Sequence, residues 1–225
     1  MTRNVPASLF VTGTDTGVGK TLVACALLRA CVAEGHRAVG MKPVAAGALQ
    51  TAEGWLNDDV ARLRAASNVA AGLREINPYC FEPAIAPHIA ARQAGGVIDL
   101  EVIAAAYRNL AARSDAVIVE GVGGFRVPLG ADYDSAALAE LLALPVVLVV
   151  GIRLGCLNHA LLTAEAIRAR GLALYGWIAN RIDRSMQCAD ENVAALTQRL
   201  DAPLLGDVPY DARIQVGQVT VQIRM

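Results

Sequence analysis

The segment from Gly13 to Thr21 reads GTDTGVGKT and has the residue types and spacing of a phosphate-binding loop. It follows an apolar run and precedes a helical pattern, which is the context that such a loop needs. Its glycines let backbone N–H groups point at phosphate oxygens, and the helix start adds a favourable dipole. We expect Lys20 to reach the β- and γ-phosphates of a nucleotide and the Thr21 hydroxyl to bind Mg²⁺. A glycine-rich turn that merely joins a strand to a helix is the alternative, because the loop is one residue longer than usual.

The residue five positions before Lys20 is Asp15. Partner-activated switch ATPases with a related loop carry a second lysine there. The loop therefore resembles the branch that lacks this lysine, which favours metabolic chemistry over a switch.

Four further polar positions fall where strand-like runs end. Lys42 lies in GMKPVAAG, Glu120 in VEGVGG and Asn180 in GWIAN, while residues 155–158 (GCLN) follow the run VVLVVG. The carboxyl ends of parallel strands meet at one edge of a sheet, where ligands bind in open α/β folds. We therefore expect these positions to lie near the phosphate loop.

The charged residues among them also have structural interpretations. Lys42 could be a surface lysine before a turn, although a place at the mouth of a phosphate site favours function. Glu120 is flanked by glycines and fits a Mg²⁺ ligand better than a solvated strand end. Asp58 and Asp59 lie at a helix start, where one could be a cap and one could complete the Mg²⁺ shell.

The uncharged positions are more ambiguous. Asn180 carries a donor and an acceptor on one amide, which matches the N6/N7 edge of adenine, but a turn residue is an equal alternative. Residues 155–158 open a helix, whose N–H groups form an anion site unless the helix start is simply capped. Cys156 is expected to be a small buried residue, since no histidine base is suggested beside it.

Strand-like and helix-like segments alternate along the whole chain. Strands are expected at residues 9–12, 38–41, 116–120, 146–151, 177–179 and 204–208, and helices at 20–34, 57–67, 99–113, 134–143, 158–170 and 187–200. This alternation predicts right-handed βαβ units in one α/β domain over residues 1–225, with a mostly parallel sheet flanked by helices. With the phosphate loop it indicates a P-loop NTPase-like fold, and the tail 211–225 has no clear pattern.

Composition narrows the class of protein. Of 225 residues, 55% are hydrophobic, 18% charged and only 4% aromatic, which predicts a sizeable aliphatic core and excludes a disordered chain. The net charge of -1 argues against a nucleic-acid-binding surface. Five scattered cysteines without a CxxC pair, no secretory signal and no bilayer-length apolar run predict a cytoplasmic protein with no membrane partner.

Several longer motifs occur in an order that resembles one family. They are FVTGTDTGVGKT, GMKPVAAG, NPYCFEPAIAPH, VEGVGG, LPVVLVVGIRLGCLNHALLTAEAI, GWIAN and LLGDVP. Over residues 8–210 the chain is similar to the dethiobiotin synthetases, P-loop ligases of biotin synthesis. The resemblance implies a homodimer that converts 7,8-diaminopelargonate, CO₂ (or bicarbonate) and MgATP into dethiobiotin, ADP and phosphate. The reaction would pass through a carbamate and a carbamic–phosphoric anhydride.

The resemblance also implies roles for individual residues. Lys20 and Lys42 would be catalytic, and the Mg²⁺ ligands would be Thr21, Asp59 and Glu120. The ATP-binding residues would be Gly17, Val18, Gly19, Lys20, Thr21, Leu22, Asp59, Glu120, Gly121, Val122, Gly123, Asn180, Arg181, Pro209, Tyr210 and Asp211. The substrate would contact Thr16, Lys42, Ala46, Gly155, Cys156, Leu157 and Asn158, the last four binding its carboxylate across the dimer interface.

Some positions depart from the family pattern. Ala46 stands where members often carry Ser or Thr, so that contact must be lost, made by backbone or supplied by water. The tail after Asp211 does not resemble the usual apolar terminal helix. A partner-regulated P-loop ATPase switch of the partitioning type is the alternative function. An amidotransferase-type ligase of corrinoid synthesis is a second alternative, which we do not expect because such chains are usually longer and no glutaminase domain fits in 225 residues.

Overall fold

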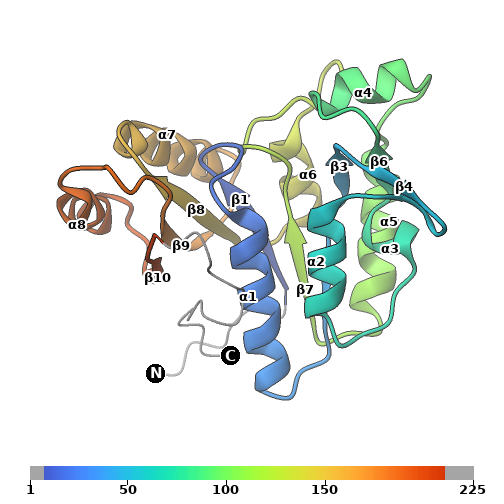
Figure 1. Cartoon of the computed structure of the whole chain (residues 1–225), viewed down its shortest axis with the longest axis horizontal. Helices are drawn as coiled ribbons and strands as arrows, with labels where there is room; N and C mark the ends of the chain where they lie inside the picture. The colour runs from blue at the N-terminus through green and yellow to red at the C-terminus, as the bar shows by residue number, and fades with distance from the viewer. Residues whose placement is uncertain (1–7, 211–225) are drawn as a thin grey trace.

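A six-stranded sheet in which every neighbouring pair is parallel forms the centre of the molecule (Figure 1). The computed structural model describes residues 8–210. The strand order is β10-β9-β8-β1-β7-β2. These strands are β1 (Ser8–Gly13), β2 (Ala38–Met41), β7 (Ala116–Glu120), β8 (Val146–Ile152), β9 (Leu174–Arg181) and β10 (Leu204–Val208). The predicted α/β fold with a parallel sheet is therefore confirmed.

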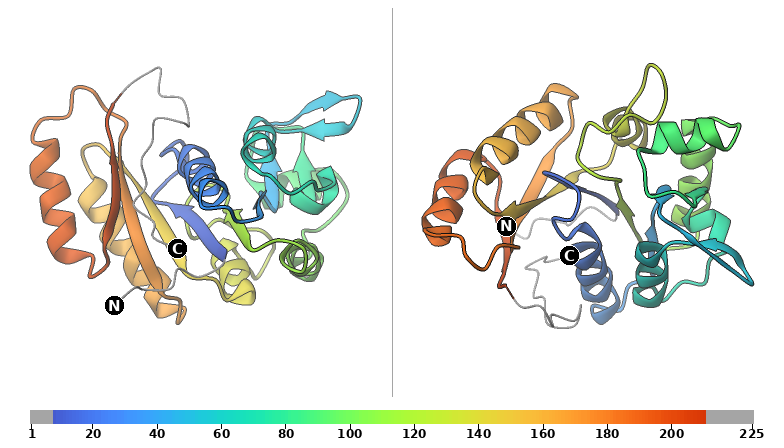
Figure 2. Two further views of the ribbon diagram at one scale, coloured as in Figure 1. Left: turned by 90° about the horizontal axis from the view of Figure 1, so that it is seen from below. Right: turned by 45° about the horizontal axis from the view of Figure 1, so that its top comes forward.

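Helices cover both faces of this sheet (Figure 2). One face packs against α1 (Lys20–Ala33) and α2 (Asp58–Ala66). The other face packs against α5 (Leu100–Ala111), α6 (Ser135–Leu142), α7 (Cys156–Ala169) and α8 (Ala189–Arg199). Two covered faces explain why the strand VVLVVGI is buried at every position, as expected of a parallel sheet.

The core is aliphatic and is divided by the sheet. Leu9 and Val11 of β1 pack with α1, whereas Phe10 between them packs on the opposite face, as the alternation of side chains along a strand requires. Trp177 and Phe10 are the largest fully buried side chains. Burial of this aliphatic surface stabilises the folded state by roughly 25 cal/mol for each Å² of apolar area removed from water. The packed core thereby holds the strand ends in place.

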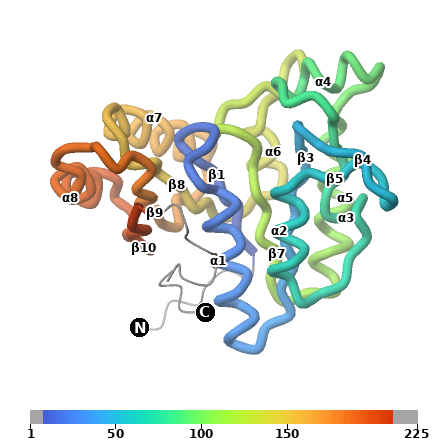
Figure 3. Tube along the Cα trace, in the orientation of Figure 1, coloured from blue at the N-terminus to red at the C-terminus, as the bar shows by residue number. Residues whose placement is uncertain are grey.

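The chain between β2 and β7 contains small elements that the sequence pattern did not predict. They are β3 (Val44–Ala46), β4 (Leu49–Thr51), β5 (Gly54–Leu56), α3 (Leu73–Ile76), β6 (Tyr79–Phe81) and α4 (Pro87–Gln93). β3 pairs with β6 in parallel, and β4 with β5 as an antiparallel hairpin. Figure 3 shows this segment gathered beyond β2, at the right of the view. It forms one wall of the site described below.

The predicted strands and long helices all occur; the strands at 38–41, 116–120 and 204–208 have the predicted ends, and the other elements differ at one or both ends. The helix expected from residue 158 begins at Cys156, the helix expected from 187 begins at Ala189, and the strand expected from 177 begins at Leu174. Among the described helices, none has the length and apolar character needed to cross a bilayer. The tail 211–225, which had no clear pattern, lies outside the described residues.

Candidate active site

The loop between β1 and α1 is held by contacts from two neighbouring strands. Thr14 N donates to the Val149 carbonyl of β8 at 3.0 Å, and Asn180 Nδ2 donates to the Val18 carbonyl at 2.8 Å. Gly19 has a positive φ of 91°, and a Cβ there would lie 2.2 Å from Asn180 Nδ2. Only glycine fits at this position, so the loop is built for close approach of its backbone to a ligand.

A cleft of about 660 Å³ opens beside this loop. Its walls come from the loop, the end of β2, β3, the start of α2, the segment before α4 and the end of β7. It is lined by Thr16, Gly17, Gly19, Lys20, Thr21, Leu22, Lys42, Ala45, Ala46, Asn57, Asp59, Arg62, Ala84, Ile85, Ala86, Pro87, Glu120, Val122, Gly123 and Val127. Most residues predicted for the phosphate, metal and substrate positions therefore share one cleft.

Two lysines and two carboxylates meet at the floor of this cleft. Lys42 Nζ lies 2.9 Å from Asp59 Oδ2 and 2.5 Å from Glu120 Oε1. The Thr21 hydroxyl donates to the same Glu120 oxygen at 2.9 Å. Lys20 Nζ donates to the Asp15 carbonyl at 3.0 Å. Lys20, Lys42 and Glu120 are all buried, so their charges act at low dielectric.

Burial and neighbouring charges shift the pKa values of these groups. Burial, helped by the nearby Lys42 ammonium, lowers the pKa of Lys20 to about 8. Burial also works against a charged Lys42, but the Glu120 and Asp59 carboxylates outweigh it and raise its pKa. The burial of Asp59 is likewise outweighed by Lys42, which lowers the pKa of that carboxyl. The Lys42–Asp59 pair is therefore ionised at neutral pH.

Glu120 behaves differently because it is completely enclosed. Burial raises its pKa, and Lys42 and Thr21 oppose that shift. Its second oxygen, Oε2, is buried and has no hydrogen-bond partner among the described residues. A carboxylate in this position depends on a neighbouring cation to stay ionised.

The oxygen atoms gathered here fit a Mg²⁺ ion. Thr21, Asp59 and Glu120 supply a hydroxyl and two carboxylates, which are hard ligands, and Glu120 Oε2 still lacks a partner. Within residues 8–210 no group of three histidine, cysteine or carboxylate side chains forms an all-protein metal cage. Mg²⁺ usually keeps waters and phosphate oxygens among its ligands, so an incomplete protein shell suits it.

The two adjacent aspartates at the start of α2 have different surroundings. The cap of this helix is Asn57, whose side chain accepts from Asp59 N at 2.9 Å, so neither aspartate is the cap. Asp58 is exposed and pairs with Arg62 at 2.6 Å. Asp59 turns toward Lys42. The cap was missed, although an Asn before two acidic residues is a helix-start signal.

The predicted adenine residues lie beside the cleft and do not line it. Asn180 is buried near the end of β9 against the phosphate loop, where its Nδ2 donates to the Val18 carbonyl. Arg181 pairs with Asp207 and Asp190, while the neighbouring Pro209 and Tyr210 are exposed. Asp211 lies outside the described residues. An adenine pocket at this point remains a prediction.

The start of α7 is also separate from the cleft. Gly155 caps it with a φ of 93° and no side-chain cap bond, Cys156 is buried as expected, and Asn158 is exposed. Arg153, just before this helix, donates to Asp15 of the phosphate loop at 2.6 Å. The helix start thus adjoins the loop, while its role toward a substrate remains a prediction.

The rest of the cleft and its edge consist of three further predicted positions and of several residues that were not predicted for the site. Val18 is buried beneath the loop, and the Gly121 carbonyl lies 3.4 Å from Lys42 Nζ. Ala46 lines the cleft without a hydroxyl, but the Asn57 side chain donates to its carbonyl at 3.0 Å. The cleft residues not predicted are Ala45, Asn57, Arg62, Ala84, Ile85, Ala86, Pro87 and Val127. Apart from the motif around residues 84–87, the sequence held no chemical signal for them.

Comparisons with known proteins agree on one family. A family model described as an AAA domain matches residues 7–216. A protein of Aromatoleum aromaticum named ATP-dependent dethiobiotin synthetase BioD is 60% identical over 220 residues, which cover 98% of each chain. A protein of Nitrosospira multiformis with the same name is 60% identical and covers 90% of this chain and 88% of its own.

Solved structures of lower similarity share the fold. The MinC:MinD cell division protein complex of Aquifex aeolicus includes a chain that matches with a TM-score of 0.56, 16% identity and coverage of 92% of this chain and 82% of its own. The septum site-determining protein MinD of Pyrococcus horikoshii, solved with Mg-ADP, matches with a TM-score of 0.51 and 19% identity. The match covers 91% of this chain and 81% of that protein's chain. At this identity the likeness shows the P-loop fold alone.

Proposed function

We propose that this cleft catalyses the carboxylation and ring closure of 7,8-diaminopelargonate, because the chain belongs to the family of ATP-dependent dethiobiotin synthetases. CO₂, drawn from bicarbonate, and ATP are the co-substrates, and the products are dethiobiotin, ADP and phosphate. The observation that carries this proposal is the meeting of Lys20 and Lys42 with Thr21, Asp59 and Glu120 beside the phosphate loop.

The first chemical obstacle is repulsion between two anions. One amine of the substrate takes up CO₂ and loses a proton, which gives a carbamate. A carbamate oxygen must then attack the γ-phosphorus of ATP while the bond to the β-phosphate oxygen breaks. Lys20 and Lys42 both line the cleft that contains the Thr21 hydroxyl, so their positive charges are already in place as this charge gathers. Preorganised positive charge of this kind is usually the largest contribution to catalysis.

Lys42 is suited to hold the carbamate because its ammonium already binds carboxylate oxygens, the same kind of acceptor that a carbamate presents. Among the described residues its partners are Asp59, Glu120 and the Gly121 carbonyl. Its raised pKa keeps it charged at neutral pH. Glu120 and Asp59, which bind the Lys42 ammonium, are also residues that would hold Mg²⁺, and a metal ion there would compete with Lys42 for their negative charge. Thr16 and Ala46 line the same cleft, and we expect them to contact the rest of the substrate.

Thr21, Asp59 and Glu120 are the residues that we expect to hold Mg²⁺. When bound, Mg²⁺ neutralises charge on the phosphate oxygens of ATP. The unpartnered Glu120 Oε2 supports this assignment, since a carboxylate oxygen buried without a partner is costly.

The second step closes the ring. The free amine attacks the carbonyl carbon of the carbamic–phosphoric anhydride, the bond to the phosphate oxygen breaks and the amine proton is lost. The product is a five-membered cyclic urea. Both amines belong to one molecule, so proximity supplies much of the rate. Lys20 and Lys42 remain beside the departing phosphate.

The substrate ends in a carboxylate, and a homodimer offers a place for it. We expect Gly155, Cys156, Leu157 and Asn158 to bind this carboxylate through backbone N–H groups at the start of α7, across the interface between two copies. No side chain caps this helix start, and although the Cys156 N–H donates to the Arg153 carbonyl at 3.0 Å, the following N–H groups of the first turn support such a site. The cytoplasm is the compartment that we propose for the reaction, in line with the five scattered cysteines.

A phosphate-release assay tests this function. Purified protein is supplied with MgATP, bicarbonate and diaminopelargonate, and each is omitted in turn. We expect phosphate release only when all are present, together with dethiobiotin detected by mass spectrometry. ATP consumption that does not depend on the diamine and is stimulated by DNA or membranes would instead favour a partitioning-type switch. That alternative is supported only by the similarity of fold.

A further inference from the structure

Asn77 is a buried amide behind the catalytic lysine, and none of the proposed chemistry uses it. It follows α3 and is 3% exposed. Its Nδ2 donates to the Lys42 carbonyl at 2.6 Å and to the Tyr79 carbonyl at 3.0 Å. One side chain therefore joins the end of β2 to the start of β6.

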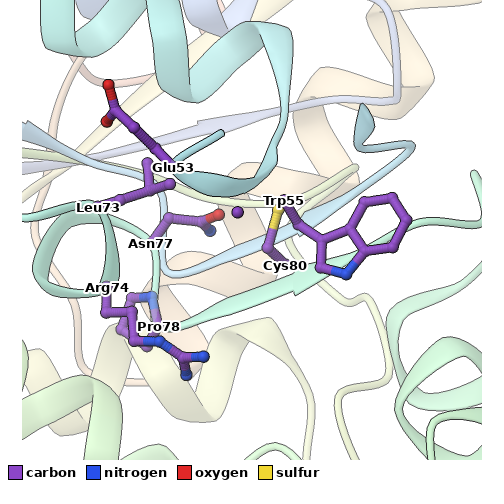
Figure 4. Close-up of a pocket in the computed structure, with 8 residues that line it drawn as sticks. Glu53, Trp55, Leu73, Arg74, Asn77, Pro78 and Cys80 are labelled. Atoms are coloured by element: carbon purple, nitrogen blue, oxygen red, sulfur yellow. The ribbon is translucent and has the colours of Figure 1, made fainter. Parts of the chain in front are cut away.

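The orientation of this amide is fixed by its partners. Both neighbouring groups are carbonyls, which only accept hydrogen bonds, so the NH₂ must face them. The Asn77 Oδ1 is left without a partner among the described residues. Asn77 also lines a cavity of about 140 Å³, together with residues that include Trp55, Pro78 and Cys80. Figure 4 shows the Asn77 amide in the middle of these residues.

The backbone of Lys42 lacks sheet partners, which makes this contact important. The pairing of β2 with β7 ends at Met41, one residue earlier. Beyond it, Lys42 N donates to the Ile76 carbonyl at 2.8 Å and Asn77 Nδ2 binds the Lys42 carbonyl. The turn at residues 76–77 thus holds both polar groups of the Lys42 backbone.

The side chain of Lys42 leaves from this fixed point toward Asp59 and Glu120. A shift of the Lys42 carbonyl would move its Cα and misplace the ammonium, and displacements of about 1 Å near a reacting centre can cost about a hundredfold in rate. We infer that Asn77 is a positioning residue for Lys42, acting through its backbone carbonyl. The inference rests on the proposed function in assigning chemistry to Lys42.

The chain offers a matched control at the other end of β2. Asn68 Nδ2 donates to the His36 carbonyl at 2.9 Å, and its Oδ1 accepts from Ala38 N at 2.8 Å. Asn77→Asp and Asn68→Asp each remove an amide donor from a backbone carbonyl near the same strand. Only the first carbonyl belongs to Lys42. Asn77→Ala serves as a second variant that adds no charge.

We expect Asn77→Asp and Asn77→Ala to lower kcat for phosphate release about tenfold or more, with KM for ATP changed less than about twofold. Asn68→Asp should lower the melting temperature and leave kcat unchanged. In a Lys42→Ala background the loss from Asn77→Asp should largely disappear, because its effect passes through Lys42. Equal kcat in Asn77→Asp and Asn68→Asp, or an undiminished loss in the Lys42→Ala background, would overturn the inference.

A readout that needs no turnover separates this inference from the proposed function. Brief acetylation followed by mass spectrometry measures how readily Lys42 reacts. The buried ammonium should react slowly in wild-type protein and in Asn68→Asp, and several times faster in both Asn77 variants. Unchanged labelling of Lys42 in the Asn77 variants contradicts positioning. Wild-type protein without diamine-dependent phosphate release contradicts the proposed function alone.

Discussion

Lys42 directly follows β2 and Glu120 ends the neighbouring parallel strand β7, and their side chains meet with Nζ and Oε1 2.5 Å apart in the interior. The sheet therefore places a cation and an anion from positions 78 residues apart in one contact. Because both side chains are buried, removing either one would leave the other charge without a partner in the protein interior, where the dielectric constant is low.

Replacing Lys42 by alanine should abolish most catalysis and preserve nucleotide binding. The ammonium that faces the reacting anions is lost, whereas the phosphate loop keeps its glycines and Lys20. We expect kcat to fall about a hundredfold or more, with ADP affinity within about threefold of wild type by calorimetry. An unchanged kcat would remove Lys42 from the mechanism.

Asp59→Asn should raise the Mg²⁺ concentration needed for half-maximal activity, since one proposed ligand loses its charge. The neighbouring Asp58→Asn is the matched control, because Asp58 is exposed and pairs only with Arg62 among the described residues. We expect about a tenfold shift for Asp59→Asn and none for Asp58→Asn in an activity titration with Mg²⁺. Equal shifts in the two variants would argue against a metal role for Asp59.

ATP binding should take up a proton at alkaline pH. Burial lowers the pKa of Lys20 in the nucleotide-free protein to about 8, and a bound phosphate will raise it. Above about pH 8 the free protein therefore carries neutral Lys20 while the complex carries the ammonium, so affinity falls as pH rises through that value. Near pH 7 both forms are already protonated and the uptake vanishes.

Calorimetry in buffers of different ionisation heat measures this uptake at pH 9 and at pH 7. Lys20→Arg provides the control, because a guanidinium stays charged throughout. Proton uptake that persists unchanged in Lys20→Arg would show that another group titrates.

Asn180→Ala should relax the preference for adenine and also loosen the phosphate loop. The Asn180 amide donates to the Val18 carbonyl of the loop, and alanine would remove that hydrogen bond together with the proposed contact to the base. We expect the ratio of kcat/KM for ATP to that for GTP to drop about tenfold, comparable to one lost base contact. An unaltered ratio would refute the adenine assignment, even if the affinity for phosphate had fallen.

The cysteines should differ sharply in their reaction with alkylating reagents. Burial raises the pKa of the Cys25 thiol to about 12 and that of Cys31 to about 11, so neither holds much thiolate at pH 8. Cys188 is exposed. Timed labelling with iodoacetamide and peptide mapping should find Cys188 modified first, with Cys25 and Cys31 protected until denaturant is added. Early modification of Cys25 would contradict its position in the core.

The main sheet was predictable because its strands are strong apolar runs that end in polar residues. VIVE and VVLVVG can be buried only in a covered sheet, and that placement brings Glu120 to the phosphate loop. Lys42 could be placed for the same reason. The small elements between β2 and β7 were not predictable, since three-residue strands and a four-residue helix have no period to detect.

Asn57 and Asn77 show why part of the site escaped the sequence. Both act through backbone groups of residues distant in the chain, Ala46 and Lys42 respectively. A side chain that binds a carbonyl leaves no trace in residue spacing, because every residue carries that carbonyl. Such contacts become visible only when the loops are in place.

The near collision between position 19 and Asn180 has a consequence for how this protein can evolve. A side chain at position 19 would strike the amide that fastens the loop and is expected to read the base. A single replacement there would disturb triphosphate and purine recognition at once, and only a simultaneous change at position 180 could relieve the clash. Even that change would leave the positive φ at position 19, which disfavours any side chain, so variation among descendants should spare Gly19 even where position 180 changes.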